Sequence, residues 1–373
     1  CTSWDLIKNS TKLFVCFGGV PLKNGQICQG GTGNHYQKES IISAASSGIE
    51  FVNVSPLKSD LMDEAGGKWL SLRPNTDTAL MLGIAHTLHI EGLSDKEFLN
   101  KYTEGFDIFL NYLLGFSDGI QKDANWAAEI CDIPANEIRE LARRMVSNRT
   151  MISMSWSLTR QDHGEQPFWM AIMLASMIGQ IGLPGGGFGF GYSATNHIGG
   201  QFTILPGAAF PQAKNEIENF IPVARISDLL LKPNENFNFD GKKYKYPDTK
   251  IVYWAGGNPF HHHQDLNRLI KAWEKPDTII CNEWCWNTLA KRSDIVLPCT
   301  TPLERKDIMM TPRDPYVVSM SKLVDPYGQA RNDYEIFTGI AKKMGVEKKF
   351  TEKRNQEEWQ EWIYNQTFDR ATA

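Results

Sequence analysis

Polar side chains follow two similar glycine turns in this sequence, and each turn ends an apolar run. The turn 18–21 (Gly-Gly-Val-Pro) leads to Lys23 and Asn24, and the turn 256–259 (Gly-Gly-Asn-Pro) leads to His262. Glycines that end a buried parallel strand let the backbone approach a ligand closely, at the edge where open α/β sheets bind nucleotides. Two such edges predict two nucleotide-like halves of one large ligand, or two ligands. The alternative interpretation is that the glycines only relieve crowding where strand meets loop.

Charged residues after other predicted strands could extend such a nucleotide site. Arg305 follows a strand end and could form a bidentate contact with a phosphate, although a solvated surface arginine fits the spacing equally well. Glu283 and Asp77 also follow strands. Carboxylates at such positions are the usual partners of ribose hydroxyls or of a guanine edge.

The histidine run 261–263 looks like a metal cluster, but adjacent side chains at the start of a helix point in different directions. Contact with a phosphate at the helix N-terminus is therefore the favoured interpretation. The seven cysteines lack the paired C-x-x-C spacing of a zinc site, and Cys281 with Cys285 is the closest pair. Buried thiols are favoured over a metal site, and no metal ligand is predicted.

A catalytic set is not evident in the sequence. Asp162 and His163 resemble an acid/base pair in a polar loop, yet no nucleophile near them has a motif context. We therefore predict no catalytic residue in this chain. The turns 18–21 and 256–259 also lack the third glycine and the spacing of G-x-G-x-x-G, which weighs against a nicotinamide-dependent dehydrogenase.

The elements that position these residues alternate between apolar strands and helices. This alternation predicts an α/β fold with two Rossmann-like parallel-sheet domains and an irregular connecting region. The elements expected in the first half are strands 13–17, 50–54 and 151–155 and helices 39–47, 79–90, 135–146 and 168–181. Those expected in the second half are strands 251–255, 278–281 and 294–297 and helices 265–273, 288–292, 333–344 and one near Glu357.

The domain boundaries follow a change in composition. Glycine, asparagine and proline are frequent in 188–245, which has one helix-like patch at 223–231, and residues 29–34 are expected to form a flexible loop. The predicted parts are a first nucleotide-binding-type domain (1–190), an irregular connection (191–245), a second nucleotide-binding-type domain (246–345) and a partial C-terminal segment (346–373).

Length and charge narrow the class of protein. The chain has 373 residues, enough for a large core, and its net charge of -4 argues against nucleic-acid binding driven by phosphate neutralisation. The longest apolar stretch, 168–183, is too short to span a bilayer, which takes about 20 apolar residues. The chain begins with Cys1, without a signal peptide or an initiator Met, and we expect it to be a fragment or a processed piece.

Several long strings resemble one family. The string 254–265 reads Trp-Ala-Gly-Gly-Asn-Pro-Phe-His-His-His-Gln-Asp, and similar strings occur in order at 75–83, 163–167, 181–189 and 293–298 with Glu304-Arg305. Together they resemble the molybdopterin oxidoreductases of the dimethyl sulfoxide reductase family over nearly the whole chain. Within the family the sequence is most similar to the dimethyl sulfoxide, trimethylamine N-oxide and biotin sulfoxide reductases.

The resemblance implies a cofactor and a set of binding residues. Members hold molybdenum between two molybdopterin guanine dinucleotides, one on each of two related α/β domains, so the implied cofactor is Mo-bis(molybdopterin guanine dinucleotide). Ser55 departs from the Ile-Asp-Pro common in the family, and Asn282-Glu283 departs from His-Asp. The implied cofactor-binding residues are Lys23, Asn24, Val54, Ser55, Pro74, Asn75, Thr76, Asp77, Trp156, Ser157 and Arg160 on the first sheet and Asn258, His262, Asn282, Glu283, Arg305 and Asp333 on the second.

The resemblance also implies an activity and a setting. The implied reaction is oxo transfer from an S-oxide or N-oxide, with electrons from a donor protein such as a c-type cytochrome, in the periplasm during anaerobic respiration. The metal-ligating serine of these reductases would precede Cys1 and their last domain would follow Ala373, so we expect the chain alone neither to hold the cofactor stably nor to turn over. The alternatives are a structural subunit of a redox complex and a nicotinamide-dependent dehydrogenase.

Overall fold

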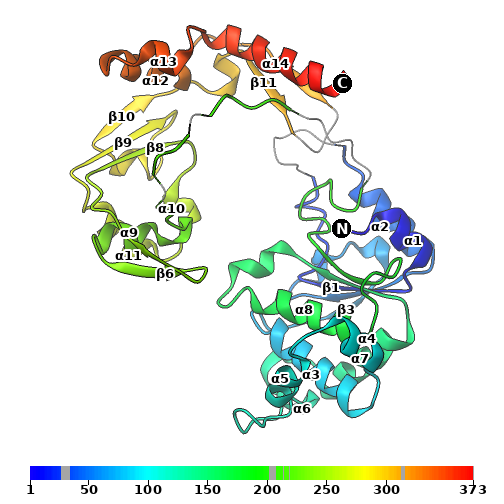
Figure 1. Cartoon of the computed structure of the whole chain (residues 1–373). Coiled ribbons are helices and arrows are strands. Elements are labelled where there is room, and N and C mark those ends of the chain that lie inside the picture. The colour runs from blue at the N-terminus through cyan, green and yellow to red at the C-terminus, as the bar shows by residue number, and fades with distance from the viewer. Residues whose placement is uncertain (27–33, 201–206, 213, 218, 312–315, 373) are drawn as a thin grey trace. The chain divides into compact units, whose positions relative to one another are not determined.

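The computed structural model describes residues 1–26, 34–200, 207–212, 214–217, 219–311 and 316–372. The described chain forms two compact units (Figure 1). Unit 1 comprises Cys1–Leu205 with Met310–Tyr316, and unit 2 comprises Pro206–Met309 with Val317–Ala373.

Five parallel strands form the sheet of unit 1. In order across the sheet they are β3 (Lys68–Leu70), β2 (Glu50–Val54), β1 (Leu13–Phe17), β4 (Thr150–Met154) and β5 (Gly187–Phe190). Every residue of β1 and β4 is buried. Continuous apolar strands of this kind are expected where helices cover both faces of a parallel sheet.

Helices cover both faces of this sheet. Alternate residues of a strand point to opposite faces, and accordingly Val15 belongs to one hydrophobic cluster while Phe14 belongs to another. The larger cluster includes residues of α3 (Asp77–Ile90), α4 (Lys96–Tyr102), α5 (Phe106–Leu113), α6 (Ala124–Cys131), α7 (Ala135–Ser147) and α8 (Gln166–Met177), and the smaller one includes residues of α1 (Trp4–Ser10) and α2 (Gln37–Ser46).

Helix α3 forms the centre of the larger cluster and begins at the carboxyl edge of the sheet. Leu80, Met81, Ile84 and Leu88 are all fully buried, and buried side chains occur around the whole helix. A helix that is apolar all round is an interior helix. Its first residue, Asp77, is therefore held in a fixed position beside the sheet.

Unit 2 contains a smaller parallel sheet. Its strands, in order, are β10 (Ile295–Pro298), β9 (Thr278–Glu283) and β8 (Ile251–Ala255). The core beside this sheet includes Leu269, Trp273 and Cys281. The other elements are α9 (Ile226–Leu231), α10 (Pro259–His262), α11 (Leu266–Trp273), α12 (Asp333–Lys343), α13 (Glu347–Thr351) and α14 (Gln356–Thr372), the antiparallel pair β6 (Asn236–Phe239) and β7 (Lys242–Lys245), and the pair β11 (Asp307–Met310) and β12 (Val317–Met320).

The predicted α/β fold with two parallel sheets is confirmed, and three local predictions are wrong. The helix predicted over 168–181 ends at Met177, because the chain adopts a left-handed conformation at Gly179 (φ 65°). The helix predicted over 288–292 is a single 3-10 turn, Ala290–Arg292. The connection 191–245 is not irregular throughout, since it contains the hairpin of β6 and β7.

Two further predictions are not decided by the fold. Most of the loop predicted at 29–34 lies outside the described residues, and the four domain boundaries stay predictions. None of the helices in the described ranges combines the length and the apolar character needed to cross a membrane.

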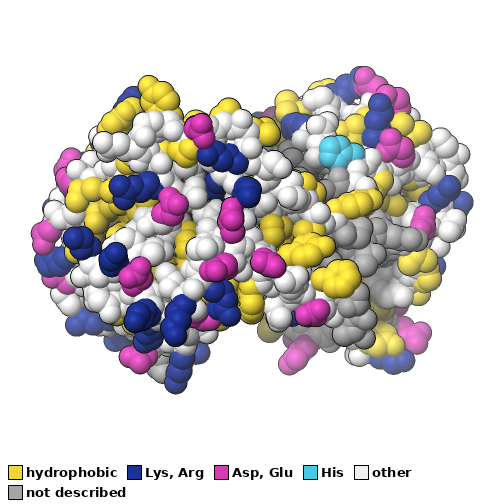
Figure 2. Space-filling model, turned by 90° about the horizontal axis from the view of Figure 1, so that it is seen from above, with side chains coloured by type: hydrophobic (Ala, Val, Ile, Leu, Met, Phe, Trp, Pro, Cys, Tyr) yellow, Lys and Arg dark blue, Asp and Glu magenta, His cyan; other side chains and the backbone are white. Residues whose placement is uncertain are grey.

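The surface carries both signs of charge. In Figure 2 basic and acidic side chains are interspersed over the visible face, with hydrophobic side chains between them. Such mixing is typical of an ordinary solvated surface.

Candidate functional site

The carboxyl ends of β1, β2, β3 and β4 and the segments that follow them form what we call the first edge, in unit 1. The Gly18 amide donates to the Val54 carbonyl at 2.8 Å, and the Ser155 amide donates to the Phe17 carbonyl at 2.8 Å. The first glycine turn therefore lies between the segments after β2 and β4. Val54 has its side chain in the core, so only its backbone belongs to the edge.

Crowding explains both glycines of this turn. Gly18 and Gly19 have φ values of 76° and 73°, which L side chains rarely adopt. A Cβ at Gly18 would lie 2.7 Å from the Cβ of Ser155, and a Cβ at Gly19 would lie 2.5 Å from the Cβ of Asp60. The alternative interpretation, relief of crowding, thus holds for the first turn.

A buried carboxylate of the first edge lies at Asp60, a residue that the sequence did not single out. The Ser55 hydroxyl donates to its Oδ2 at 2.6 Å, and the Lys23 ammonium lies 3.1 Å from its Oδ1. The resemblance implies a carboxylate directly after β2; here Ser55 stands at that position and its hydroxyl is bound to the Asp60 carboxylate. Lys23 remains 62% exposed, and Asn24 lies half-buried beside it.

Asp77 is the most unusual residue of this edge. It is 2% exposed, and no described residue donates a hydrogen bond to its buried Oδ1. Burial is the main cause that raises the pKa of Asp77 to about 6. The preceding turn is exposed at Pro74 and left-handed at Asn75 (φ 64°), and the Thr76 hydroxyl donates to the Arg73 carbonyl at 2.6 Å.

The segment after β4 brings an aromatic ring and a cation to the first edge. Trp156, Ser157 and Arg160 belong to one 3-10 helix, Trp156–Arg160, and all three are exposed. Gly191 (φ 85°) is packed against the indole of Trp156, so a side chain there would displace the ring. Trp156 and Arg160 are therefore available for contact with a flat or anionic ligand.

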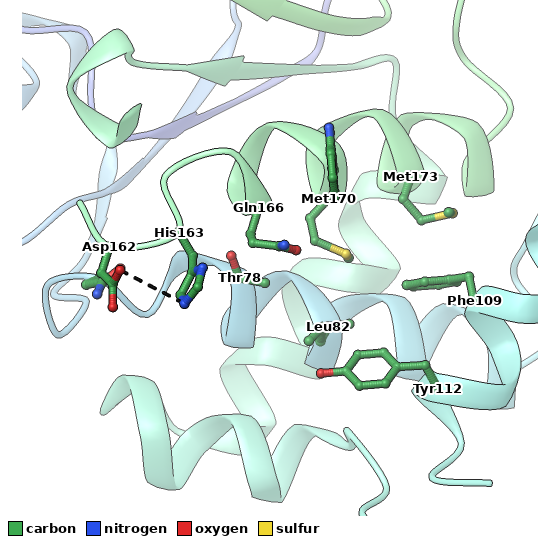
Figure 3. Close-up of a pocket in the computed structure, with 11 residues that line it drawn as sticks. Thr78, Leu82, Phe109, Tyr112, Asp162, His163, Gln166, Met170 and Met173 are labelled. Atoms are coloured by element: carbon green, nitrogen blue, oxygen red, sulfur yellow. Dashed lines mark ion pairs between the residues drawn. The ribbon is translucent and has the colours of Figure 1, made fainter. Parts of the chain in front are cut away.

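A cavity of about 710 Å³ borders the turn before α3 (Figure 3). Its polar end contains Asp162, His163 and Gln166, and its apolar end contains Met170, Phe109 and other large side chains. His163 Nε2 lies 4.0 Å from Asp162 Oδ1, but the side chains are 76% and 84% exposed. A solvated ion pair of this kind contributes little to stability.

The carboxyl ends of β8, β9 and β10, with the start of α12, form what we call the second edge, in unit 2. Its glycines differ from those of the first turn. Gly256 and Gly257 have φ values of 79° and 75°, but a Cβ at Gly256 would meet no atom of the described residues within 4 Å. This turn is therefore open on the side where a Cβ would point.

Asn258 follows this open turn with a buried amide. It is 7% exposed, its Oδ1 accepts the Phe260 amide at 3.0 Å, and within the described ranges its buried Nδ2 has no acceptor. His262 is exposed and lies on α10, a helix of a single turn. The phosphate-binding helix N-terminus expected here is therefore short.

Three side chains of the second edge form a hydrogen-bonded chain. The Tyr253 hydroxyl donates to Asn282 Oδ1 at 2.8 Å, and Asn282 Nδ2 donates to Asp333 Oδ1 at 2.9 Å. Asn282 is 3% exposed. The predicted residues Asn282 and Asp333 thus lie in contact although they are far apart in the sequence.

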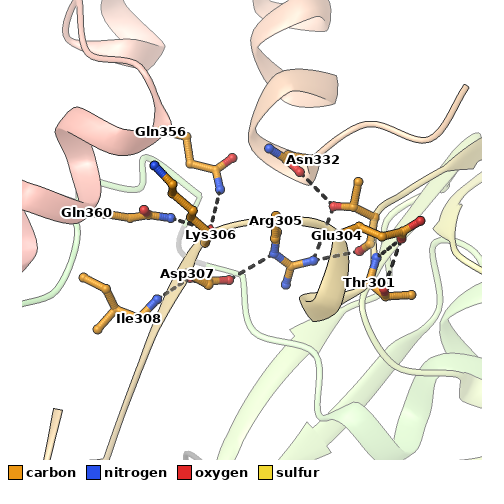
Figure 4. Close-up of polar contacts among 10 residues, drawn as sticks. Thr301, Glu304, Arg305, Lys306, Asp307, Ile308, Asn332, Gln356 and Gln360 are labelled. Carbon is orange, nitrogen blue, oxygen red and sulfur yellow. Dashed lines mark hydrogen bonds and ion pairs between the residues drawn. The ribbon is translucent and has the colours of Figure 1, made fainter. Parts of the chain in front are cut away.

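The remaining predicted residues of the second edge are held by protein groups. Glu283 accepts from the Asn287 amide at 2.6 Å and from the Trp284 backbone at 3.2 Å. Arg305 donates to the Thr300 carbonyl at 2.7 Å and to Asp307 at 3.0 Å (Figure 4). The Arg305 side chain is 21% exposed and hydrogen-bonded to Thr300 and Asp307, so it is not a solvated surface arginine.

The Cys299 thiol lies close to the predicted charged residues of the second edge, and its pKa responds to them. Burial is the main cause that raises the pKa of its thiol to about 11; the Asp333 and Glu283 carboxylates raise it further, and Arg305 lowers it. Asp333, Glu283 and Arg305 therefore all lie near the Cys299 thiol. Over the described ranges, no three His, Cys, Asp or Glu side chains are grouped in a way that could hold a metal ion.

A family model described as molybdopterin oxidoreductase matches residues 1–343. The chain belongs to this molybdopterin oxidoreductase family. It is 44% identical to a biotin sulfoxide reductase of Cereibacter sphaeroides over 98% of the chain and 49% of the relative. It is 43% identical to a dimethyl sulfoxide/trimethylamine N-oxide reductase of the same organism over 99% of the chain and 46% of the relative.

Other comparisons agree with the family. A trimethylamine-N-oxide reductase of Haemophilus influenzae is 43% identical over the whole chain and 46% of its own length, so the chain spans about half the length of these relatives. The fold is similar to that of acetylene hydratase from Pelobacter acetylenicus, with a TM-score of 0.54 and 17% identity over 91% of this chain and 48% of that chain. At that identity the likeness shows the fold alone.

The two edges fit the molybdenum–pterin cofactor that the family implies. Asp77 presents a buried acceptor at Oδ1 and Asn258 a buried donor at Nδ2, and neither of these two atoms has a partner within the described part of the chain. Buried polar groups normally have partners, so each is satisfied best by a bound ligand. The open turn at Gly256 leaves room for such a ligand beside Asn258.

Sequence reasoning missed three residues of these edges. Asp60, Tyr253 and Cys299 contact or surround predicted residues, but none belongs to a motif that names it. The position of Tyr253 in an apolar strand gave no signal, because only the pairing of β8 with β9 places its hydroxyl beside Asn282. Asp60 had a weak signal, since Lys58-Ser59-Asp60 is a polar turn directly after β2.

Proposed function

We propose that the protein containing this chain reduces an S-oxide or N-oxide, with Mo-bis(molybdopterin guanine dinucleotide) as its cofactor. The observation that carries the proposal is the pair of edges, each with a buried polar atom that lacks a protein partner. The high identity to three S-oxide and N-oxide reductases supports the same reaction class. Electron delivery by a c-type cytochrome and a periplasmic location are parts of the same proposal.

The residues of the first edge would hold one guanine dinucleotide. The Asp77 carboxylate can accept the two neighbouring N–H groups of a guanine, one of them at the buried Oδ1 that lacks a donor within the described residues. Lys23 and Arg160 supply positive charge for a pyrophosphate, and Trp156 supplies an exposed ring face.

The residues of the second edge would hold the other guanine dinucleotide. Asn258 Nδ2 can donate to a phosphate or pterin oxygen, and Asp333 can accept from a guanine. Arg305, held by Thr300 and Asp307, adds a fixed positive charge to this edge. When bound, the cofactor supplies the oxo-transfer chemistry at its metal, while the chain's own residues bind and orient it.

The proposal is tested on protein purified from its complete reading frame after anaerobic expression. We expect one molybdenum and two GMP molecules released by acid per polypeptide, together with reduction of dimethyl sulfoxide, trimethylamine N-oxide or biotin sulfoxide by reduced viologen. A preparation that retains the metal and both nucleotides but reduces none of these oxides would exclude the proposed reaction. A preparation without GMP would exclude the cofactor.

Guanosine binding at the first edge is expected to depend on pH. An ionised Asp77 accepts both guanine N–H groups, and with a pKa of about 6 only about a tenth of it is ionised at pH 5. Affinity for GMP should therefore rise about tenfold between pH 5 and pH 7.5. Calorimetric titration of cofactor-free Asp333→Asn protein checks this, because that background reports the first edge. The same titration with Asp77→Asn added should show no such rise; an unchanged rise would contradict the assignment.

A further inference from the structure

The hydrogen-bonded chain of the second edge joins three separate elements. Tyr253 lies in β8, Asn282 near the end of β9 and Asp333 at the first position of α12. The strand register pairs Tyr253 with Ile280, so Asn282 is a diagonal neighbour on the adjacent strand. The two distances are 2.8 Å and 2.9 Å, both within the range of good hydrogen bonds.

The chemistry of the outer two groups fixes the orientation of the amide between them. A carboxylate only accepts, so the amide nitrogen of Asn282 must face Asp333. The amide oxygen then faces Tyr253, whose hydroxyl donates to it. A flipped amide would place its oxygen against the Asp333 carboxylate and lose that hydrogen bond, while its nitrogen could only donate to the Tyr253 hydroxyl oxygen. Because Asn282 is 3% exposed, water cannot readily replace the lost hydrogen bond.

The orientation of Asn282 determines what Asp333 offers to a ligand. Its Oδ1 is held by the Asn282 amide, which sets the rotation of the carboxylate. Cys299, with Glu283 and Arg305 around it, lies within electrostatic range of the same carboxylate. A carboxylate with a fixed plane can accept two adjacent N–H groups, which guanine has and adenine lacks.

We propose that Tyr253 is a positioning residue that acts through Asn282 on Asp333 and thereby sets the preference of the second edge for guanine. This inference rests on the proposed function, because it assumes that the second edge binds a guanosine nucleotide. In this role the Tyr253 hydroxyl contributes to ligand binding as well as to packing beside the sheet.

The hydroxyl can be removed without disturbing the packing of the ring. The Tyr253 ring lies 5.3 Å from the Phe337 ring, centroid to centroid, and Tyr253→Phe keeps this contact. Tyr244→Phe is a matched control, because Tyr244 lies in β7 of the same unit, outside the second edge, and its ring likewise packs against a phenylalanine, Phe237, at 5.5 Å between centroids. Neither change creates a cavity.

The test is calorimetric titration with GMP and with IMP, which lacks the 2-amino group. The protein is the full-length chain purified without cofactor, in an Asp77→Asn background so that the titration reports the second edge. The unmodified second edge is expected to bind GMP more tightly than IMP. Tyr253→Phe should weaken GMP binding about tenfold, which corresponds to one lost hydrogen-bond contribution of about 1.4 kcal/mol, and should remove most of the preference over IMP. Tyr244→Phe should change neither the GMP affinity nor the preference over IMP.

A second comparison separates positioning from a general structural effect. If Tyr253 acts only through Asp333, Tyr253→Phe should have no further effect on GMP affinity once Asp333→Asn is present. Equal losses for Tyr253→Phe and Tyr244→Phe, or fully additive losses with Asp333→Asn, would overturn the role of Tyr253. If the unmodified second edge shows no preference for GMP over IMP, the proposal that this edge binds guanine is wrong. The positioning role of Tyr253, which depends on that part of the proposed function, is then wrong as well.

Discussion

Gly19→Ala is expected to lower the free energy of unfolding of unit 1 by about 2–5 kcal/mol. The left-handed conformation at φ 73° costs an L residue about 1–2 kcal/mol. The added Cβ would lie 2.5 Å from both the Cβ and the carbonyl oxygen of Asp60, and overpacking of this kind typically costs about 1–3 kcal/mol more. Chemical denaturation of the variant and the parent protein measures the difference.

Gly256→Ala, in the second glycine turn, is the control for Gly19→Ala. Gly256 has a similar φ of 79°, but its Cβ would meet no atom of the described chain within 4 Å. Gly256→Ala should therefore cost only the backbone term, about 1–2 kcal/mol. Equal losses for the two variants would show that crowding at Asp60 is not what requires glycine in the first turn.

Asp77→Asn is expected to stabilise the cofactor-free protein at pH 7 while abolishing its guanosine binding at the first edge. The pKa of Asp77 is raised from 3.8 to about 6, mainly by burial, so keeping the carboxylate ionised in the folded state costs stability above pH 6. The shift corresponds to about 3 kcal/mol at most, and a neutral amide avoids this cost.

The direction in which the stability difference changes with pH tests whether burial of the ionised Asp77 carboxylate causes it. Between the unfolded value of 3.8 and the folded value of about 6, the folded protein binds the additional proton. The cost is therefore fully present above pH 6 and disappears as the pH falls below 3.8. Thermal unfolding of both proteins between pH 4 and pH 8 should show an advantage for Asp77→Asn that grows with pH.

Asp60→Asn is the matched control for this prediction, because Asp60 is a buried carboxylate of the same edge that has partners. Ser55 and Lys23 both contact it, so the substitution should destabilise the protein by about 1–2 kcal/mol. An Asp77→Asn variant that is also destabilised at pH 7 would show that Asp77 has a stabilising partner in solution.

Most strands of the two parallel sheets were predictable because each is a short apolar run that ends at a turn, whereas β3 (Lys68–Leu70) and β5 (Gly187–Phe190) were missed. Residues 13–17 and 251–255 became β1 and β8 with these bounds. The hairpin of β6 and β7 was missed although the sequence contains its signal, an Asp-Gly pair between the alternating residues of 236–239 and 242–245. A general excess of glycine and asparagine in that region concealed the alternation.

The sites were harder to predict because their geometry depends on contacts between distant segments. Two glycine turns of nearly the same sequence have different causes: Gly19 is crowded by Asp60, whereas Gly256 is open. Nothing in the local sequence distinguishes them. Likewise, the register that places Tyr253 beside Asn282 exists only in the paired strands.

The pairing of β1 also has a consequence for biosynthesis. Leu13 pairs with Glu50 on one side and with Thr150 on the other. At ribosomal rates of roughly 5–20 residues per second, the second partner is made on the order of ten seconds after the first. During that interval one side of β1 is an open strand edge, which can pair wrongly with another chain. Chaperone binding to the nascent segment that contains β1 and β2 would protect this edge until β4 emerges.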